Sequence, residues 1–238
     1  MMKNGEKVNR PFIKVGFLGL LVLGMSIVLL MVFPSRAPWM MDGFSTPIIA
    51  FEFVQSQSEV YRLFGLTGSP DQLSMTQSMI RAMDFGNRLD YIYMVLYTSF
   101  LFFFSFVCAK NTGQKYYYAG SMLSFVILVA DALENIQLLR ITAKITSQDF
   151  AKELSFLHCF TWIKWGGITF VFLILAPYFF KGRTYSKVIA AIGISSFILS
   201  VPAYLNRSVL NELLGLSVAL MFLMMIVYSF IYKTESEK

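Results

Sequence analysis

The sequence predicts an all-α membrane protein, a polytopic bundle of six transmembrane helices in which residues 1–238 form a single domain. Of the 238 residues, 56% are hydrophobic and only 14% are charged, whereas a soluble domain is usually about a quarter charged. The apolar residues also come in continuous runs of about 20, the length that crosses a bilayer. Strands of a lipid-facing barrel would instead be shorter and would alternate.

Six runs have this length, and each is expected to form one span. The first could instead be a signal peptide, because basic residues precede it and Ser35-Arg36-Ala37 follows it. Its 19 residues exceed the usual signal-peptide core of about 7–15, so an uncleaved span is favoured. The predicted spans are residues 15–33, 89–108, 117–139, 156–180, 188–205 and 213–232.

The distribution of basic residues predicts the orientation, because Lys and Arg in short loops mark the cytoplasmic side. With the N-terminus inside, eleven basic residues fall on short inner segments and eight on longer outer segments. We therefore expect both termini in the cytoplasm. Topology then explains the net charge of +6, and no nucleic-acid partner is expected.

The largest segment outside the spans is the outer loop of residues 34–88, which is expected to contain amphipathic or interfacial helices. Residues 56–59 have the pattern of a capping box, and Gly65 could close the helix that they begin. Residues 47–54 are apolar apart from one acid. They are too short to span, so they are expected to be re-entrant or interfacial.

A second helix in this loop is indicated by Ser69 and Pro70, which resemble a helix start. Leu73, Ile80 and Met83 follow at roughly helical spacing. An amphipathic helix on the membrane face is the structure that this spacing favours.

Ionisable residues inside the spans are the most informative, because each costs about 2.5–3.5 kcal/mol at a helix centre unless it is paired. Asp131, Glu134 and Asn135 share one face of the third span. Asp131 lies eight residues from the outer end of its span, and Lys164 lies eight residues from the outer end of the fourth. Both are therefore roughly 12 Å deep, and we predict Lys164 within about 4 Å of Asp131 or Glu134.

Further polar groups are expected in the same outer half of the membrane. They come from the second span, from the fourth span one turn from Lys164, and from the outer loop. The predicted ligand-binding cluster comprises Glu52, Asp90, Tyr93, Tyr97, Asp131, Glu134, Asn135, Thr161 and Lys164. A structural interpretation stays open, in which a buried pair only fixes the packing of the third and fourth spans.

No motif indicates a cofactor, a metal site or a catalytic residue. His158 is the only histidine, which argues against a zinc hydrolase, and no nucleotide fingerprint is present. Residues 84–90 lack part of the acidic signature of CDP-alcohol phosphotransferases. The two cysteines are expected on opposite sides of the bilayer, so they should not form a disulfide.

The motifs at residues 46–53, 89–91, 131–135 and 161–164 resemble a group of uncharacterised bacterial multi-pass inner-membrane proteins. The similar part covers roughly residues 45–180, and its motifs are short. The resemblance implies a bacterial inner membrane and implies no activity.

Three functions remain open. The leading hypothesis is binding or transport of a small amphipathic molecule, a lipid or a cation at the outer-facing cluster. The alternatives are a structural subunit that binds a protein partner through residues 34–88, and a membrane-embedded lipid-modifying enzyme. In the enzyme, Asp131 or Glu134 would act as a general base tuned by Lys164.

Overall fold

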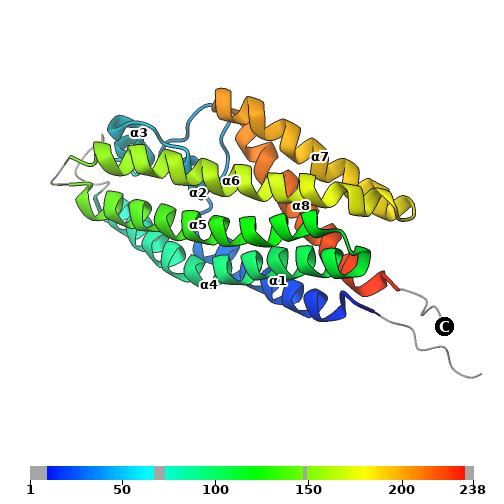
Figure 1. Ribbon diagram of the computed structural model, residues 1–238. Coiled ribbons are helices and arrows are strands. Elements are labelled where there is room, and N and C mark those ends of the chain that lie inside the picture. Colours follow the sequence, from blue (N-terminus) through cyan, green and yellow to red (C-terminus); the bar gives the residue numbers. More distant parts are fainter. Residues whose placement is uncertain (1–9, 67–72, 147–148, 234–238) are drawn as a thin grey trace, which may run out of the picture.

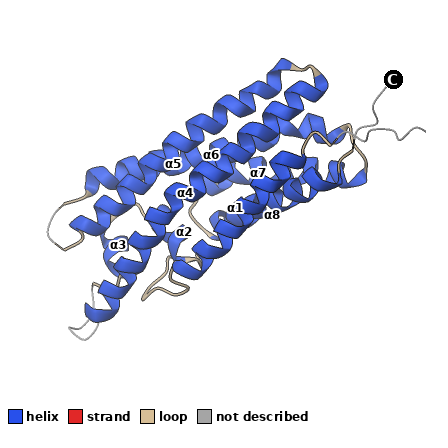
Figure 2. Ribbon diagram, turned by 90° about the horizontal axis from the view of Figure 1, so that it is seen from below, coloured by secondary structure: helices blue, strands red, loops and turns tan. Residues whose placement is uncertain are grey.

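The structure, a computed structural model, describes residues 10–66, 73–146 and 149–233. The described residues form helices and connections without a strand (Figures 1 and 2). Six helices are long and apolar enough to cross a membrane, which confirms the predicted fold class. They are α1 (Ile13–Val32), α4 (Leu73–Thr112), α5 (Tyr118–Lys144), α6 (Ala151–Phe180), α7 (Thr184–Leu205) and α8 (Val209–Ile231).

The helices pack mainly against their neighbours in the sequence, as short connections between antiparallel helices require. A 3-10 turn, η2 (Lys115–Tyr117), joins α4 to α5, and α1 closes the bundle by packing against α4 and α8. Both described ends of the chain lie at one end of the bundle (Figure 1). We call this the inner end, following the predicted orientation, and the opposite end the outer end.

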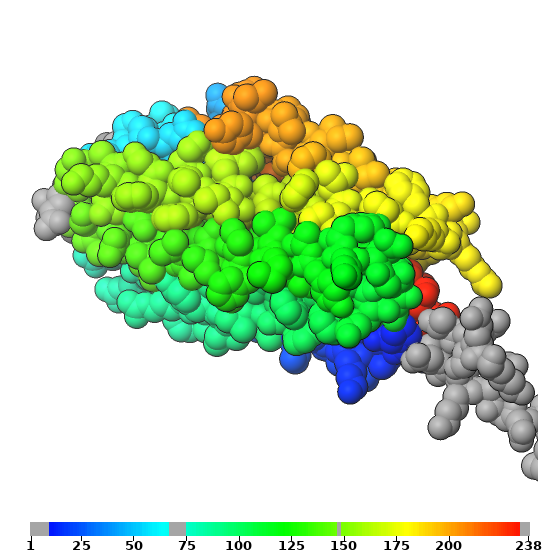
Figure 3. All heavy atoms as spheres, in the orientation of Figure 1, coloured from blue at the N-terminus to red at the C-terminus, as the bar shows by residue number. Residues whose placement is uncertain are grey.

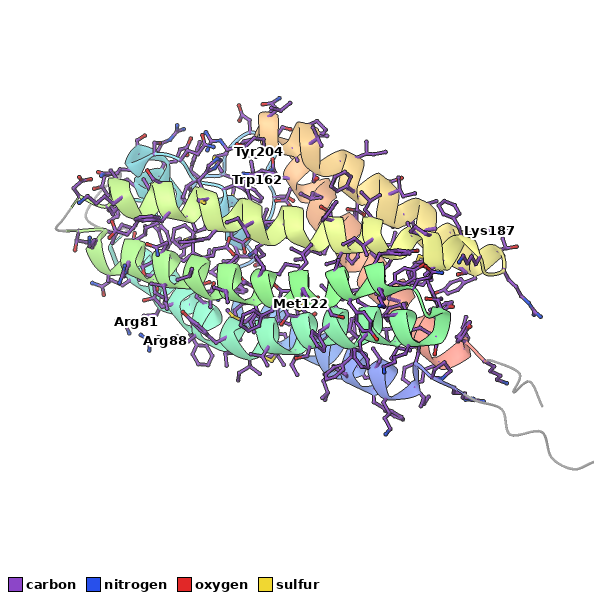
Figure 4. All side chains as sticks on the ribbon, viewed as in Figure 1. Arg81, Arg88, Met122, Trp162, Lys187 and Tyr204 are labelled. Carbon is purple, nitrogen blue, oxygen red and sulfur yellow. The ribbon has the colours of Figure 1, made fainter. Side chains whose placement is uncertain are left out.

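Helix α4 corrects the sequence prediction of a separate loop helix. It runs unbroken for 40 residues, or about 60 Å, which is twice the apolar core of a bilayer. Residues 73–88 therefore belong to the second spanning helix and do not form a separate helix on the membrane face. Hydropathy missed this continuity because it identifies only the apolar part of a helix. Arg81 and Arg88, which project from α4 (Figure 4), lower the mean hydropathy without ending the helix. The start signal at Ser69 and Pro70 lies outside the described residues.

The outer segment contains two short helices, α2 (Pro47–Glu52) and α3 (Gln57–Leu63). The capping box is confirmed, because Ser56 Oγ accepts from the Glu59 amide while the Glu59 carboxylate accepts from the Ser56 amide. Gly65 ends α3 as predicted. Its φ of +73° is one that glycine adopts without strain, and it lets the Leu66 amide bond back to the Tyr61 carbonyl at 2.8 Å.

Helix α2 enters the bundle and packs against α5, α6 and α8, so the re-entrant alternative describes it better than the interfacial one. Ala50 and Phe51 are fully buried. Glu212, in the first turn of α8, holds the start of α2: its carboxylate accepts from the amides of Ser45 and Thr46 at 2.9 and 2.8 Å, and from Thr46 Oγ1 at 2.8 Å.

Two hydrophobic clusters make up the interior. The inner one is rich in aromatic residues such as Phe100, Phe104 and Phe172. The outer one joins α2 and α3 to the outer ends of α4, α5 and α6 through residues such as Phe51 and Phe64. Large apolar side chains also stay exposed along the spans, as a surface facing lipid requires. The polar residues of the predicted site lie between the two clusters.

Candidate functional site: a buried charge cluster

Lys164 of α6 lies at the centre of a group of carboxylates. Its Nζ is 3.1 Å from Glu52 Oε1 and 3.5 Å from Asp131 Oδ1, and it also contacts Glu134 Oε2. The Lys164 side chain is 8% exposed, Glu52 is 13% exposed, and Asp131 and Glu134 are at most 2% exposed. The predicted pairing of Lys164 is therefore confirmed. We call these four residues the charge cluster.

Helix geometry explains how the sequence brings these groups together. Asp131 and Glu134 are three residues apart on α5, so they share one face, which packs against the antiparallel α6. Lys164 lies at the matching depth on α6. Glu52 is the last residue of α2 and enters from the outer segment. Three separate elements thus build the charge cluster.

Each carboxylate in the charge cluster also accepts a hydrogen bond from a neutral donor. Tyr97 OH donates to Asp131 Oδ2 at 2.5 Å, and Thr161 Oγ1 donates to Glu134 Oε1 at 2.6 Å. The indole Nε1 of Trp165 donates to Glu52 Oε2 at 2.9 Å. The prediction included Tyr97 and Thr161 and missed Trp165, because nothing in a sequence distinguishes an indole that donates from one that only packs.

The other three predicted residues lie beside the charge cluster and form no hydrogen bond or ion pair with Lys164. Asn135 Nδ2 donates to Asp90 Oδ2 at 2.7 Å, and Asp90 remains partly exposed. The Tyr93 ring lies 5.3 Å from that of Tyr97, and its hydroxyl is 3.3 Å from Ser26 Oγ of α1. These residues extend the polar layer toward α1 and α4.

Acidic groups outnumber basic ones in this layer. Three carboxylates and one ammonium give the charge cluster a formal charge of −2 if all are ionised, and adjacent Asp90 makes it −3. A net charge buried in an apolar medium is strongly unfavourable. Protons or a cation must therefore neutralise part of it. Among residues 10–66, 73–146 and 149–233, no three His, Cys, Asp or Glu side chains are placed to hold a metal ion.

Comparison with known proteins does not extend this description. No family model matches the chain, and no curated protein or solved structure is significantly similar to it. Function must therefore be inferred from the site, and the resemblance to bacterial inner-membrane proteins stays a prediction.

Two cavities open at the outer end, on either side of the start of α3. One has a volume of about 640 Å³ and lies between α3 and the α7–α8 connection. The other, about 550 Å³, lies between the start of α3 and the first turns of α6. Neither is lined by a residue of the charge cluster. The two cysteines are free, with Cys108 toward the inner end of α4 and Cys159 toward the outer end of α6, as expected.

Proposed function

We propose that this multi-pass membrane protein binds protons at the charge cluster as part of a binding or transport role, without chemical conversion of a substrate. The excess of carboxyl groups over the single buried ammonium carries the proposal. A buried excess of negative charge favours uptake of a neutralising cation, and the proton is the smallest one available.

The arrangement of oxygen atoms favours a proton over a metal ion. In each carboxylate of the charge cluster, one oxygen faces Lys164 and the other accepts from Tyr97, Thr161 or Trp165. The three oxygens that face Lys164 converge on its ammonium nitrogen, so the point that Ca²⁺ or Mg²⁺ coordination would need is already occupied by a cation. A proton needs no such shared point.

The position of Glu52 supports a role in gaining or releasing the proton. Asp131 and Glu134 belong to a long spanning helix, whereas Glu52 belongs to a six-residue helix held by contacts at its two ends. Displacement of α2 would remove one of the three carboxylates facing Lys164. That change would reduce the excess of carboxylates over the ammonium group of Lys164.

Infrared spectroscopy of the purified protein tests the proposal, because a protonated carboxyl group has a C=O band that shifts in D₂O. At neutral pH we expect this band in the wild type, and we expect Glu134→Gln or Asp131→Asn to weaken it. Glu153→Gln is the matched control, because Glu153 pairs with Lys144 at 2.7 Å near the outer end and should be ionised. A wild type without the band would refute proton binding at rest.

A structural subunit is the second candidate, because Lys164 joins residues from α2, α5 and α6. In that role the charge cluster would only dock these elements. A variant that replaces the charged residues with apolar ones of similar size would then fold and retain function, since such replacements are often neutral. Loss of function in a variant that keeps its thermal stability would favour proton binding.

We further propose a plasma-membrane location with both termini in the cytoplasm. Over the full sequence, eleven Lys or Arg fall on the short inner segments and eight on the longer outer segments. This asymmetry is the one that the positive-inside rule requires. Labelling of Lys187→Cys, an exposed position in the first turn of α7, in a background without Cys108 and Cys159, should succeed only after the membrane is permeabilised.

A further inference from the structure

The open cavity of about 640 Å³ at the outer end brings charged and aromatic side chains together. It lies between α3 and the outer end of α7, which appear together along the upper edge of the molecule in Figure 3. Its volume falls within the range of about 300–1,000 Å³ typical of small-molecule sites. We call it the outer basin. Its polar and aromatic lining includes Trp39, Asp42, Glu59, Arg62, Tyr204 and Arg207.

One side of the outer basin is a fixed ion pair. Arg207 Nη1 and Nη2 donate to the two oxygens of Glu59 at 2.9 and 3.0 Å, and Nη1 also donates to the Phe53 carbonyl at 3.0 Å. In such a bidentate pair the geometry is fixed, and most N–H donors of the arginine are already engaged in hydrogen bonds. Arg207 and Glu59 therefore shape the outer basin, and their charges cancel.

Arg62 is the cation that remains available in the outer basin. Its guanidinium carbon lies 3.8 Å from the centre of the Trp39 ring, so stacking holds its plane. Among the described residues, no carboxylate lies within 4.0 Å of its nitrogen atoms. A stacked guanidinium with free donors suits the bidentate recognition of a phosphate group. Asp42, which is exposed, can accept from an ammonium group in the same ligand.

The outer basin is continuous with the surface that faces lipid. Tyr204 and Leu205 line it at the outer end of α7, where they are 54% and 77% exposed. Val201, one turn closer to the inner end of α7, is also 54% exposed. Figure 4 shows Tyr204 at this end of α7. A ligand with its headgroup in the outer basin could therefore keep its acyl chains against α7, within the bilayer.

We propose that the outer basin binds the phosphate-bearing headgroup of a membrane phospholipid, with the phosphate on Arg62. The proposal is independent of proton binding, because the two sites share no residue. It names a second ligand for the protein and assigns the positioning of the phosphate to the Arg62–Trp39 stack.

Native mass spectrometry of the intact protein in mild detergent, titrated with dipalmitoyl phosphatidylethanolamine, tests the proposal. We expect Arg62→Gln to weaken lipid binding by about tenfold, because one charge-assisted contact is lost. Arg81→Gln is the matched control, since Arg81 is an exposed arginine of α4 outside the outer basin, on the face shown in Figure 4. Arg62 is exposed, so its replacement should leave the melting temperature unchanged.

Soluble glycerophosphoethanolamine distinguishes a lipid from a free phosphate ester. Weak competition by this headgroup, with loss of lipid binding in Arg62→Gln, supports a phospholipid site. Competition as strong as that of the intact lipid would overturn the membrane source of the ligand. Equal lipid binding by Arg62→Gln and Arg81→Gln would show only the lipid shell common to spanning helices and would overturn the site.

Discussion

Replacement of Lys164 by methionine is the most direct test of the charge cluster. Methionine keeps much of the apolar volume of the side chain and removes the ammonium group that faces three buried carboxylates. Breaking a buried pair by removing one partner typically destabilises a protein by about 3–5 kcal/mol. We expect Lys164→Met to lie in this range. Adding Asp131→Leu should restore only part of the stability, since two carboxylates remain.

A double-mutant cycle isolates the contact between Lys164 and Glu134. Glu134→Gln removes the negative charge and keeps an oxygen that can accept from Thr161. If the two charges interact directly, the double variant should lose less stability than the sum of the single variants, by about 0.5–3 kcal/mol. Unfolding by SDS titration in mixed micelles, followed by tryptophan fluorescence, measures each free energy.

Lys152→Met is the matched control for this cycle, because Lys152 is an exposed lysine on the same helix. It should change the free energy of unfolding by no more than about 0.5 kcal/mol. If Lys164→Met were equally mild, or if the cycle were additive within about 0.5 kcal/mol, the buried ammonium would not hold these carboxylates.

The other predictions concern the outer segment. Burial alone would raise the pKa of Glu59, but the hydrogen bonds and charge of Arg207 and the hydrogen bonds from two backbone amides lower this pKa from its ordinary value. The ionised Glu59 therefore stabilises the folded protein at a pH above its pKa in the unfolded chain, and this stabilisation is lost as the pH falls through its pKa in the folded protein. In thermal melts between about pH 5 and 3, the melting temperature should fall less in Glu59→Gln than in the wild type. Gly43 has a φ of +85°, and an added Cβ would lie 2.4 Å from a backbone nitrogen at the start of α8. Gly43→Ala should therefore destabilise the protein by about 1–3 kcal/mol or more. Gly24→Ala is the control and should not destabilise it, because the space around Gly24 is open. Ser56→Ala removes the α3 cap and should cost about 1 kcal/mol in the same melts.

The sequence predicted the helices and the central pairing well because both depend on simple lengths. A bilayer fixes how many apolar residues a span needs, and the rise of a helix fixes how deep a residue lies. Asp131 and Lys164 could therefore be placed at equal depth by counting from the outer ends of their spans. Antiparallel packing of neighbouring helices then brought them together.

The contacts made by the outer segment could not be predicted in the same way. Glu52 was included among the candidates, but a six-residue helix has no periodicity that indicates which side faces the bundle. The pairing of Glu59 with Arg207 joins the outer segment to the connection between α7 and α8, 148 positions further along the chain. Neither segment has a sequence periodicity that predicts where its side chains lie. The full length of α4 was missed because hydropathy identifies only the apolar part of a helix that crosses the bilayer.

The opposite charges on α5 and α6 also have a consequence for biogenesis. The two helices are consecutive and joined by a short connection, so they can leave the translocon as a hairpin. In such a hairpin Lys164 meets Asp131 and Glu134 before either helix meets lipid alone, which offsets an insertion penalty of about 2.5–3.5 kcal/mol for each charge. Glu52 is synthesised earlier but cannot dock until this hairpin exists. A nascent chain that stops before α6 would expose unpaired acids in the bilayer, and we expect membrane proteases to remove it.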